Sequence, residues 1–309
     1  MQSLLNKVGL TTLMIWVTHS ASALTYNGFA DVADLQLNGS AAKHHAALRL
    51  TSSDLQYFQS GSAFHKTTLS AAKFSSFFKF RITQKGGYIS GTKTGGDGFV
   101  FVIQPISPTA IGDSGGHMGY AGITGGSVAV EFDGFQNTNS NDPVLPHVAI
   151  DVNGSTIHDG TLPVRKILPG FNDGRIWYAW IDYDSKTLTV RVSPTAVRPV
   201  NPQLKKELDI PTLLGNVTDA YVGFTAGTGG FWENHDILYW EYREAYQPVE
   251  VLGGIGDRMQ AVAVTCQNLD TNQIVEIPAA KTNAWDCEKA GFVGHPGNNT
   301  VITIKGTLK

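Results

Sequence analysis

Short apolar runs separated by turn residues follow one another along most of the chain, and no stretch of comparable strength has the spacing of an amphipathic helix. The clearest run is TLTVRV at residues 187–192, in which aliphatic and polar side chains alternate strictly. Successive side chains of a strand point to opposite faces, so this run predicts a strand with one buried face. The turn-forming segment DSK precedes it, and RIWYAWID at residues 175–182 precedes the turn. We therefore predict that the two segments form a β-hairpin.

The same pattern predicts strands throughout residues 24–246, at 47–51, 77–83, 99–104, 127–132, 148–152, 175–182, 187–192, 220–225 and 236–241. Glycine is abundant, with 34 residues, and 10% of the chain is aromatic, which is typical of strands joined by tight turns. Short strands without intervening helices bury their apolar faces best between two packed sheets. The predicted fold class is all-β, with an antiparallel β-sandwich as the main domain.

The last part of the chain, residues 249–309, changes in character and is predicted to be a small second β module. It has its own predicted strands at 261–265 and 301–305 and holds both cysteines of the chain, Cys266 and Cys287. A module of this size buries little core, and small exported domains are often stabilised by disulfides. We expect Cys266 and Cys287 to form one such disulfide, although their spacing alone does not establish the pairing.

The N-terminus has the pattern of a secretory signal peptide. Lys7 precedes the apolar segment VGLTTLMIWV, and Ala21-Ser22-Ala23 matches a cleavage site after residue 23. An ordinary buried helix is the alternative. No later apolar run is long enough to span a bilayer. The mature chain, starting at Leu24, is therefore expected to be secreted, to the extracellular space or the periplasm.

The charge of the chain argues against nucleic acid as its main partner. Only 16% of the residues are charged, the formal net charge is -3, and no long basic run occurs. Hydrophobic residues make up 42% of the chain, which is enough to build a core and excludes a disordered protein.

Against this low charge density, the segment VEFDGFQNTNSNDPVLPH at residues 130–147 concentrates metal-ligating groups. Its side-chain donors are Glu131, Asp133, Asn137, Asp142 and His147. Calcium takes about six to eight oxygen ligands, and the two aspartates, the asparagine and the backbone carbonyl of Phe135 offer several. Glu131 and His147 add a carboxylate and an imidazole, which suit Mn²⁺ or another transition ion. The alternative interpretation is a solvated acidic loop beside a strand.

The run VAVEFDGFQNTNSNDPVLPHVAIDVN at residues 128–153 resembles the metal-binding segment of the legume-type (L-type) lectins. GGDGFVFVIQ at residues 95–104 and VGFTAGTGGFWENHDILYW at residues 222–240 are similar to further strands and loops of that family, in the same order. The resemblance extends over most of residues 24–246 and implies a lectin jelly roll. It also implies one Ca²⁺ and one Mn²⁺, or another transition metal, held by the six residues 131, 133, 135, 137, 142 and 147.

The sugar site follows from the same resemblance. Its implied members are Asp97, Gly116, Phe135, Asn137, Gly230 and Phe231. In the family, the aspartate accepts hydrogen bonds from sugar hydroxyls and the peptide before it is cis, which here is Gly96–Asp97. The asparagine amide and the backbone N–H groups of the glycines donate to the sugar, and Phe135 faces the apolar side of its ring. The loop with Gly230 and Phe231 sets the choice of monosaccharide.

The main alternative is a glycoside hydrolase of jelly-roll type, because one such family carries E-x-D-x-x-E on a strand and EFDGFQN begins in the same way. A retaining hydrolase needs two carboxyl groups about 5–5.5 Å apart. The second glutamate is missing, because Gln136 and Asn137 stand in its place and neither can act as an acid. A third interpretation is an adhesion or structural protein that acts through the C-terminal module. We therefore predict a non-catalytic, calcium-dependent lectin whose partners are glycans or polysaccharides, with homodimerisation left open.

Overall fold

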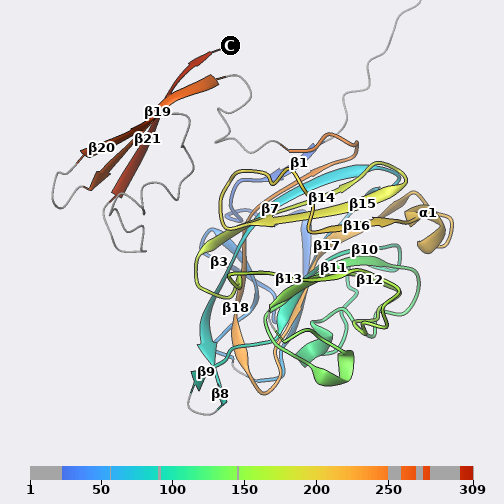
Figure 1. Cartoon of the computed structure of the whole chain (residues 1–309). Helices are drawn as coiled ribbons and strands as arrows, with labels where there is room; N and C mark the ends of the chain where they lie inside the picture. Colours follow the sequence, from blue (N-terminus) through green and yellow to red (C-terminus); the bar gives the residue numbers. More distant parts are fainter. Residues whose placement is uncertain are drawn as a thin grey trace, which may run out of the picture.

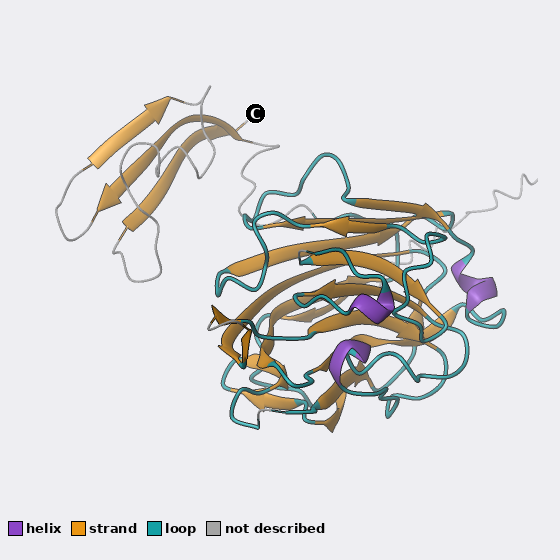
Figure 2. Cartoon of the chain, turned by 60° about the horizontal axis from the view of Figure 1, so that its bottom comes forward, coloured by secondary structure: helices purple, strands orange, loops and turns teal. Residues whose placement is uncertain are grey.

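The computed structural model describes residues 23–55, 57–89, 92–144, 146–249, 259–268, 274–278 and 300–308. Strands make up most of the described chain, and its helices are short segments within loops (Figure 2). These helices are α1 (Ile210–Leu213), η1 (Gly115–His117) and η2 (Thr138–Ser140). All strand pairs are antiparallel.

The first sheet has the order β16-β15-β14-β7-β18-β4-β3, and β1 also pairs with β18. Its strands are β16 (Leu204–Glu207), β15 (Thr187–Ser193), β14 (Ile176–Tyr183), β7 (Phe74–Gly86), β18 (Trp232–Arg243), β4 (Ala47–Thr51), β3 (Ala42–His44) and β1 (Ala23–Tyr26). The predicted hairpin is confirmed, because β14 pairs with β15 from Tyr183–Leu188 to Tyr178–Ser193. The alternating run of β15 buries its aliphatic residues and leaves its polar ones half-buried.

The second sheet has the order β13-β12-β11-β10-β17-β5-β2, and β6 also pairs with β17. Its strands are β13 (Val164–Lys166), β12 (His147–Val152), β11 (Val128–Asp133), β10 (Gly98–Gln104), β17 (Asp219–Gly227), β5 (Ser60–His65), β2 (Leu35–Gly39) and β6 (Leu69–Ser70). A separate small hairpin joins β8 (Tyr88–Ile89) to β9 (Thr92–Lys93). In Figure 1 the first sheet, with β7, β14 and β15, forms a layer above the second sheet, with β10, β11 and β12. The predicted all-β sandwich is therefore confirmed.

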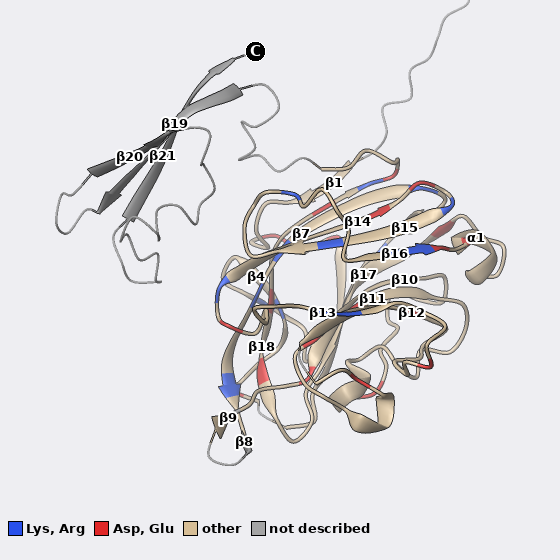
Figure 3. Cartoon of the chain, in the orientation of Figure 1, with Lys and Arg blue, Asp and Glu red and all other residues tan. Residues whose placement is uncertain are grey.

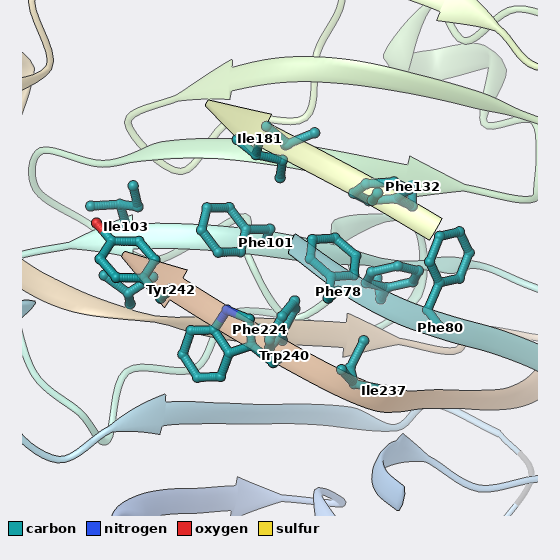
Figure 4. Close-up of a cluster of buried hydrophobic side chains, with 14 of the residues drawn as sticks. Phe78, Phe80, Phe101, Ile103, Phe132, Ile181, Phe224, Ile237, Trp240 and Tyr242 are labelled. Carbon is teal, nitrogen blue, oxygen red and sulfur yellow. The ribbon is translucent and has the colours of Figure 1, made fainter. Parts of the chain in front are cut away.

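The core between the sheets is rich in aromatic rings (Figure 4). Phe78 of β7 is fully buried, and its ring centroid lies 5.1 Å from that of Phe224 of β17 and 5.5 Å from that of Phe132 of β11. Both pairs meet edge to face, an arrangement that the charge distribution of the rings favours. The core therefore joins the two sheets directly beneath the strand that carries the predicted metal ligands.

The second sheet is covered on its other face as well. A second cluster packs there, in which Met118, Tyr120 and Ile123 of the long loop after β10 lie against Val100 and other strand residues. Ser60 Oγ donates a hydrogen bond of 2.6 Å to the backbone carbonyl of Gly112, which fastens this loop to β5. Polar residues on the outer face of the sheet can therefore be buried, since the loop excludes water from them.

The C-terminal strands β19 (Met259–Asn268), β20 (Ile274–Pro278) and β21 (Thr300–Leu308) form a sheet of their own. The strands predicted at 261–265 and 301–305 lie within β19 and β21. Val249 is buried against Trp180 of the sandwich, whose Nε1 donates to the Val249 carbonyl at 2.9 Å. The division into two domains near residue 249 stays a prediction. The disulfide between Cys266 and Cys287 also stays a prediction, because Cys287 lies outside the described residues and only the backbone of Cys266 is described.

Residues 1–22, the larger part of the predicted signal peptide, lie outside the described residues, and Ala23 begins β1. Within the described ranges, every helix is too short or too polar to cross a membrane. Acidic and basic residues are interleaved along the strands of the sandwich (Figure 3), as expected from the small net charge.

Candidate functional site

The pairing of β11 with β12 places the predicted acidic residues on one face of the second sheet. Asp133 lies opposite His147, and Glu131 lies opposite Ala149. Directly opposed residues of antiparallel strands share a face, and the intervening Phe132 points into the core instead. The alternation of apolar and polar residues thus separates the hydrophobic core from a polar cluster on the other side of the same strands.

Five side chains converge in this cluster. His147 Nε2 lies 2.9 Å from Glu131 Oε1, and His158 Nε2 lies 2.9 Å from the same oxygen. His158 Nε2 is also 3.4 Å from Asp142 Oδ1. Two groups, Glu131 with His147 and His158, and Asp133 with Asp142 and His147, each offer three ligand atoms that all lie within 4.8 Å of one another.

The loop after β11 is held in place by the same carboxylates. Asp133 Oδ1 accepts a hydrogen bond of 2.6 Å from the Phe135 backbone N–H, and Asp142 Oδ2 accepts one of 2.6 Å from the Asn137 N–H. These bonds bring the backbone of Phe135 and the side chain of Asn137 next to the acidic cluster. The residues predicted to hold calcium are therefore close together in the structure.

Burial sets the protonation of the cluster. It raises the pKa of Asp133 well above its usual range, and the negative charges of Glu131 and Asp142 raise it further. Burial likewise raises the pKa of Asp151 well above its usual range, and the negative charge of Glu131 beside it raises it further. Burial alone would raise the pKa of Glu131, but its hydrogen bonds with His147 and His158 outweigh this effect and hold the pKa at about 2. Without a cation, the cluster thus tends to take up protons.

The donor set fits divalent cations. Asn137 Oδ1 and His147 Nδ1 are buried without a hydrogen-bond partner in the part of the chain that the structure describes, and the buried carboxyls of Glu131 and Asp151 share a hydrogen bond only when Asp151 is protonated. A buried polar group without a partner costs about 1–3 kcal/mol, more for a charged group. Carboxylate and amide oxygens are ligands for calcium, and a carboxylate with imidazole suits a transition ion. Both classes of ion predicted from the sequence are compatible with these side chains.

Asp97 lies beside this cluster, directly before β10, and the predicted cis peptide bond Gly96–Asp97 is confirmed. The residue is only 5% exposed. Burial raises its pKa to about 7, while hydrogen bonds from the Asn137 side chain and the Gly229 backbone oppose a larger rise. Its Oδ2 has no partner among the described residues, so one carboxylate oxygen is available to a ligand.

The other predicted sugar-site residues surround Asp97. A Cβ added to Gly116 would lie 2.6 Å from the Asn137 side-chain amide, so this loop approaches closely only because it has a glycine. Phe135 and Phe231 are half-buried and stack with centroids 5.0 Å apart. Gly230 is exposed, and nothing lies within 4 Å of the place where its Cβ would be. All six predicted residues therefore gather around one position.

Two residues were not predicted from the sequence, His158 in the cluster and Asp151 beside it. Asp151 follows His147 and Ala149 on the same face of β12, so the alternation of that strand contained its signal. His158 belongs to the loop after β12, and its side chain is 6% exposed. No periodicity relates a loop residue to a strand face, so the sequence pattern carried no signal for His158.

Comparison with known proteins gives the family of the chain. The model of the legume lectin domain matches residues 21–252. L-type lectin-domain containing receptor kinase VIII.1 of Arabidopsis thaliana is 33% identical over 204 residues, which cover 64% of this chain and 26% of the relative. Receptor kinase VIII.2 of the same plant is 30% identical over 188 residues, covering 59% and 25%. The chain thus spans about a quarter of the length of these relatives.

Solved lectin structures share the fold. The lectin from Bauhinia forficata in complex with GalNAc is 26% identical with a TM-score of 0.60, over 72% of this chain and 98% of that one. The basic winged bean lectin with Tn-antigen is 27% identical, with the same TM-score and coverage. Family and fold support a carbohydrate-binding, non-catalytic lectin and give no support to the hydrolase alternative. By sequence and by structure, the chain belongs to the legume lectin domain family.

Proposed function

We propose that the chain is a secreted, calcium-dependent lectin that binds a sugar at Asp97 without catalysing a reaction. The observation that carries the proposal is the unpartnered, buried Oδ2 of Asp97, a residue whose carboxylate also accepts a hydrogen bond from the Asn137 side-chain amide. Sugar hydroxyls both donate and accept hydrogen bonds. A carboxylate makes stronger hydrogen bonds with them than a neutral acceptor does. An acceptor and donors placed side by side therefore match the edge of a sugar ring.

Asn137 and Gly116 complete this polar edge. The Asn137 side chain donates to Asp97, and Gly116 lies against the same amide. We propose that Asn137 Nδ2 and the backbone N–H of Gly116 donate to the sugar. Gly230 leaves the opposite side open and, with Phe231, bounds the space that selects one monosaccharide over another.

Phe135 supplies the apolar part of the site. Its ring stacks against Phe231, and both rings are half-buried, so part of their surface faces solvent. The C–H face of a sugar ring is apolar and gains free energy when it covers such a surface. Ring stacking on Phe135 would therefore orient the sugar, whose hydroxyls then meet Asp97.

The acidic cluster would hold the two metal ions. We propose that Asp133, Asn137, Asp142 and the Phe135 carbonyl hold Ca²⁺, and that Glu131, Asp133, Asp142 and His147 hold Mn²⁺ or another transition ion. Bound ions would supply the positive charge that these buried carboxylates lack. The loop of residues 134–142 depends on the same carboxylates for its hydrogen bonds. Sugar binding would then depend on calcium because the ion holds Phe135 and Asn137 in the positions in which they contact the sugar.

We also propose secretion, supported by the signal-peptide pattern of residues 1–23. A shallow, solvated site for one sugar is expected to bind weakly, so useful avidity would require several sites. Glycans carried on a surface or a polysaccharide would be partners of this kind. A homodimer would provide two sites, and light scattering of the purified chain at several concentrations would test for it.

The test is a glycan array probed with the full mature chain, starting with glycans that end in galactose or GalNAc, since solved neighbours carry GalNAc and Tn-antigen. The array is run with Ca²⁺ and Mn²⁺, after removal of the metals, and after their return. Asp97→Asn is the test variant because it keeps the shape of the side chain and removes its charge. Asp219→Asn, at an exposed position of β17, is the matched control.

Binding that disappears with the metals, returns with them, and is lost in Asp97→Asn but kept in Asp219→Asn would support the proposal. Binding that survives both metal removal and Asp97→Asn would place the activity on another surface and overturn it. Circular dichroism of both variants shows whether any loss comes from unfolding.

A further inference from the structure

His158 occupies a fixed position in the acidic cluster. Its backbone N–H donates to the Ser140 carbonyl at 2.9 Å, and its own carbonyl accepts a hydrogen bond of 3.2 Å from Asn141 Nδ2. Both partners belong to the loop that carries Asp142. These two hydrogen bonds to the His158 backbone attach the loop after β12 to the loop after β11, and the imidazole, with 6% exposure, is directed into the cluster.

The distances around His158 match the edges of a coordination polyhedron. The three atoms Glu131 Oε1, His147 Nε2 and His158 Nε2 are separated by 2.9, 2.9 and 3.3 Å. Zinc binds imidazole nitrogen and carboxylate oxygen at about 2.0–2.2 Å, so neighbouring ligands lie about 3.0–3.4 Å apart. A single ion could thus contact all three atoms without rearrangement of the side chains.

Hydrogen bonds inside the cluster do not satisfy all of its atoms. Two imidazole nitrogens and one carboxylate oxygen converge on one point, whereas His147 Nδ1 is buried without a partner among the described residues. A simple ion pair would use one histidine for the carboxylate. A cation among the three atoms would instead be bound by both imidazole nitrogens and the carboxylate oxygen at once.

We propose that His158 is a direct ligand of the transition ion, together with Glu131 and His147, and that this second imidazole increases the preference of the site for Zn²⁺ over Mn²⁺. The inference rests on the metal site of the proposed function. Imidazole nitrogen suits zinc, whereas carboxylate and water suit manganese, and zinc forms the tighter complexes with a given set of ligands. Replacing an oxygen ligand by a second nitrogen increases that difference.

The experiment compares Zn²⁺ and Mn²⁺ affinities of the metal-free full chain by calorimetric titration, with Ca²⁺ present throughout. The variants are His158→Ser and, as a matched control, His44→Ser, whose side chain is exposed on β3. Loss of a partner outside the metal's own ligands already costs about 10–100-fold in affinity. We expect His158→Ser to weaken Zn²⁺ binding by at least about 100-fold and Mn²⁺ binding by less than about tenfold.

A second measurement uses the unchanged protein, in case His158→Ser fails to fold. Loaded with Co²⁺ as a substitute for Zn²⁺, the chain should show paramagnetically shifted ring N–H signals from two coordinated histidines. Equal losses of Zn²⁺ and Mn²⁺ affinity in His158→Ser, or signals from a single histidine, would overturn the proposal. Glycan binding is not a readout here, so a failure of the lectin function would leave this result interpretable.

Discussion

Removing the metals should reverse the pH dependence of the protein's stability. Asp133 and Asp151 are fully buried, and their pKa values in the folded chain lie well above that of an exposed aspartate. Between about pH 4, where an unfolded aspartate titrates, and the raised folded pKa, the folded chain binds more protons than the unfolded chain. The metal-free protein should therefore lose stability as the pH rises through this window. Bound cations require deprotonated ligands, so the loaded protein should lose stability as the pH falls.

The size of the effect can be isolated with Asp151→Asn, which has the same shape and does not titrate. Each excess proton changes the free energy of unfolding by about 1.4 kcal/mol per pH unit. The stability of the metal-free Asp151→Asn variant should thus fall less steeply with rising pH than that of the unchanged protein, by up to about 1.4 kcal/mol per pH unit. Burial raises the pKa values of Asp97 and Glu233 to about 7 and 8, so these two groups also make the folded chain less stable as the pH rises. Burial lowers the pKa of His235 to about 3, which acts in the opposite direction. These groups are common to both proteins and cancel in the comparison.

The assay is urea unfolding followed by tryptophan fluorescence at pH 5, 6 and 7, with metal-free buffers and with saturating Ca²⁺ and Mn²⁺. Asp219→Asn makes the same chemical change at an exposed position, so its free energy of unfolding should depend on pH as that of the unchanged protein does. Parallel stability curves for the metal-free protein and Asp151→Asn would refute the reasoning. They would mean that Asp151 is ionised in the folded chain without a cation.

Three further predictions concern the site and the core. Gly116→Ala places a methyl group 2.6 Å from the Asn137 amide and should lower glycan affinity at least about tenfold in titrations, with little change in the urea midpoint. Phe78→Ala removes a fully buried ring and should lower the free energy of unfolding by about 3–5 kcal/mol in urea titrations, while an unchanged midpoint would contradict the packing described above. Phe58 is 72% exposed with a φ of 51°, and its N–H donates to Gly229 next to Asp97. Phe58→Ala should therefore lower the affinity for oligosaccharides more than the affinity for the terminal monosaccharide, as measured in paired titrations.

The site residues on β11 and β12 could be predicted from the sequence, because the alternation of apolar and polar residues along a strand can be seen in a few neighbouring positions. Glu131 and Asp133 flank a core residue, Phe132, so the sequence itself places them on the opposite face of the sheet. The same rule applied to β12 would also have identified Asp151, which shares its face with His147. The burial of this polar face was not predictable in the same way. It depends on the loop that brings Met118 and its neighbours over the sheet, and a long loop has no repeating pattern.

The loop-borne half of the site depends on how loops meet, which only the folded chain specifies. His158 reaches Glu131 because its backbone N–H bonds to the Ser140 carbonyl, and Phe58 lies next to the predicted sugar site because its N–H bonds to the Gly229 carbonyl. Such contacts leave the strands unchanged, so they can differ between related chains without cost to the sandwich. The strand carboxylates would bind divalent cations in general, and the imidazole of His158 would then set which ion binds best. Differences in ion and sugar preference within the family should accordingly be sought in the loops equivalent to residues 153–158 and 228–231, rather than on the strands.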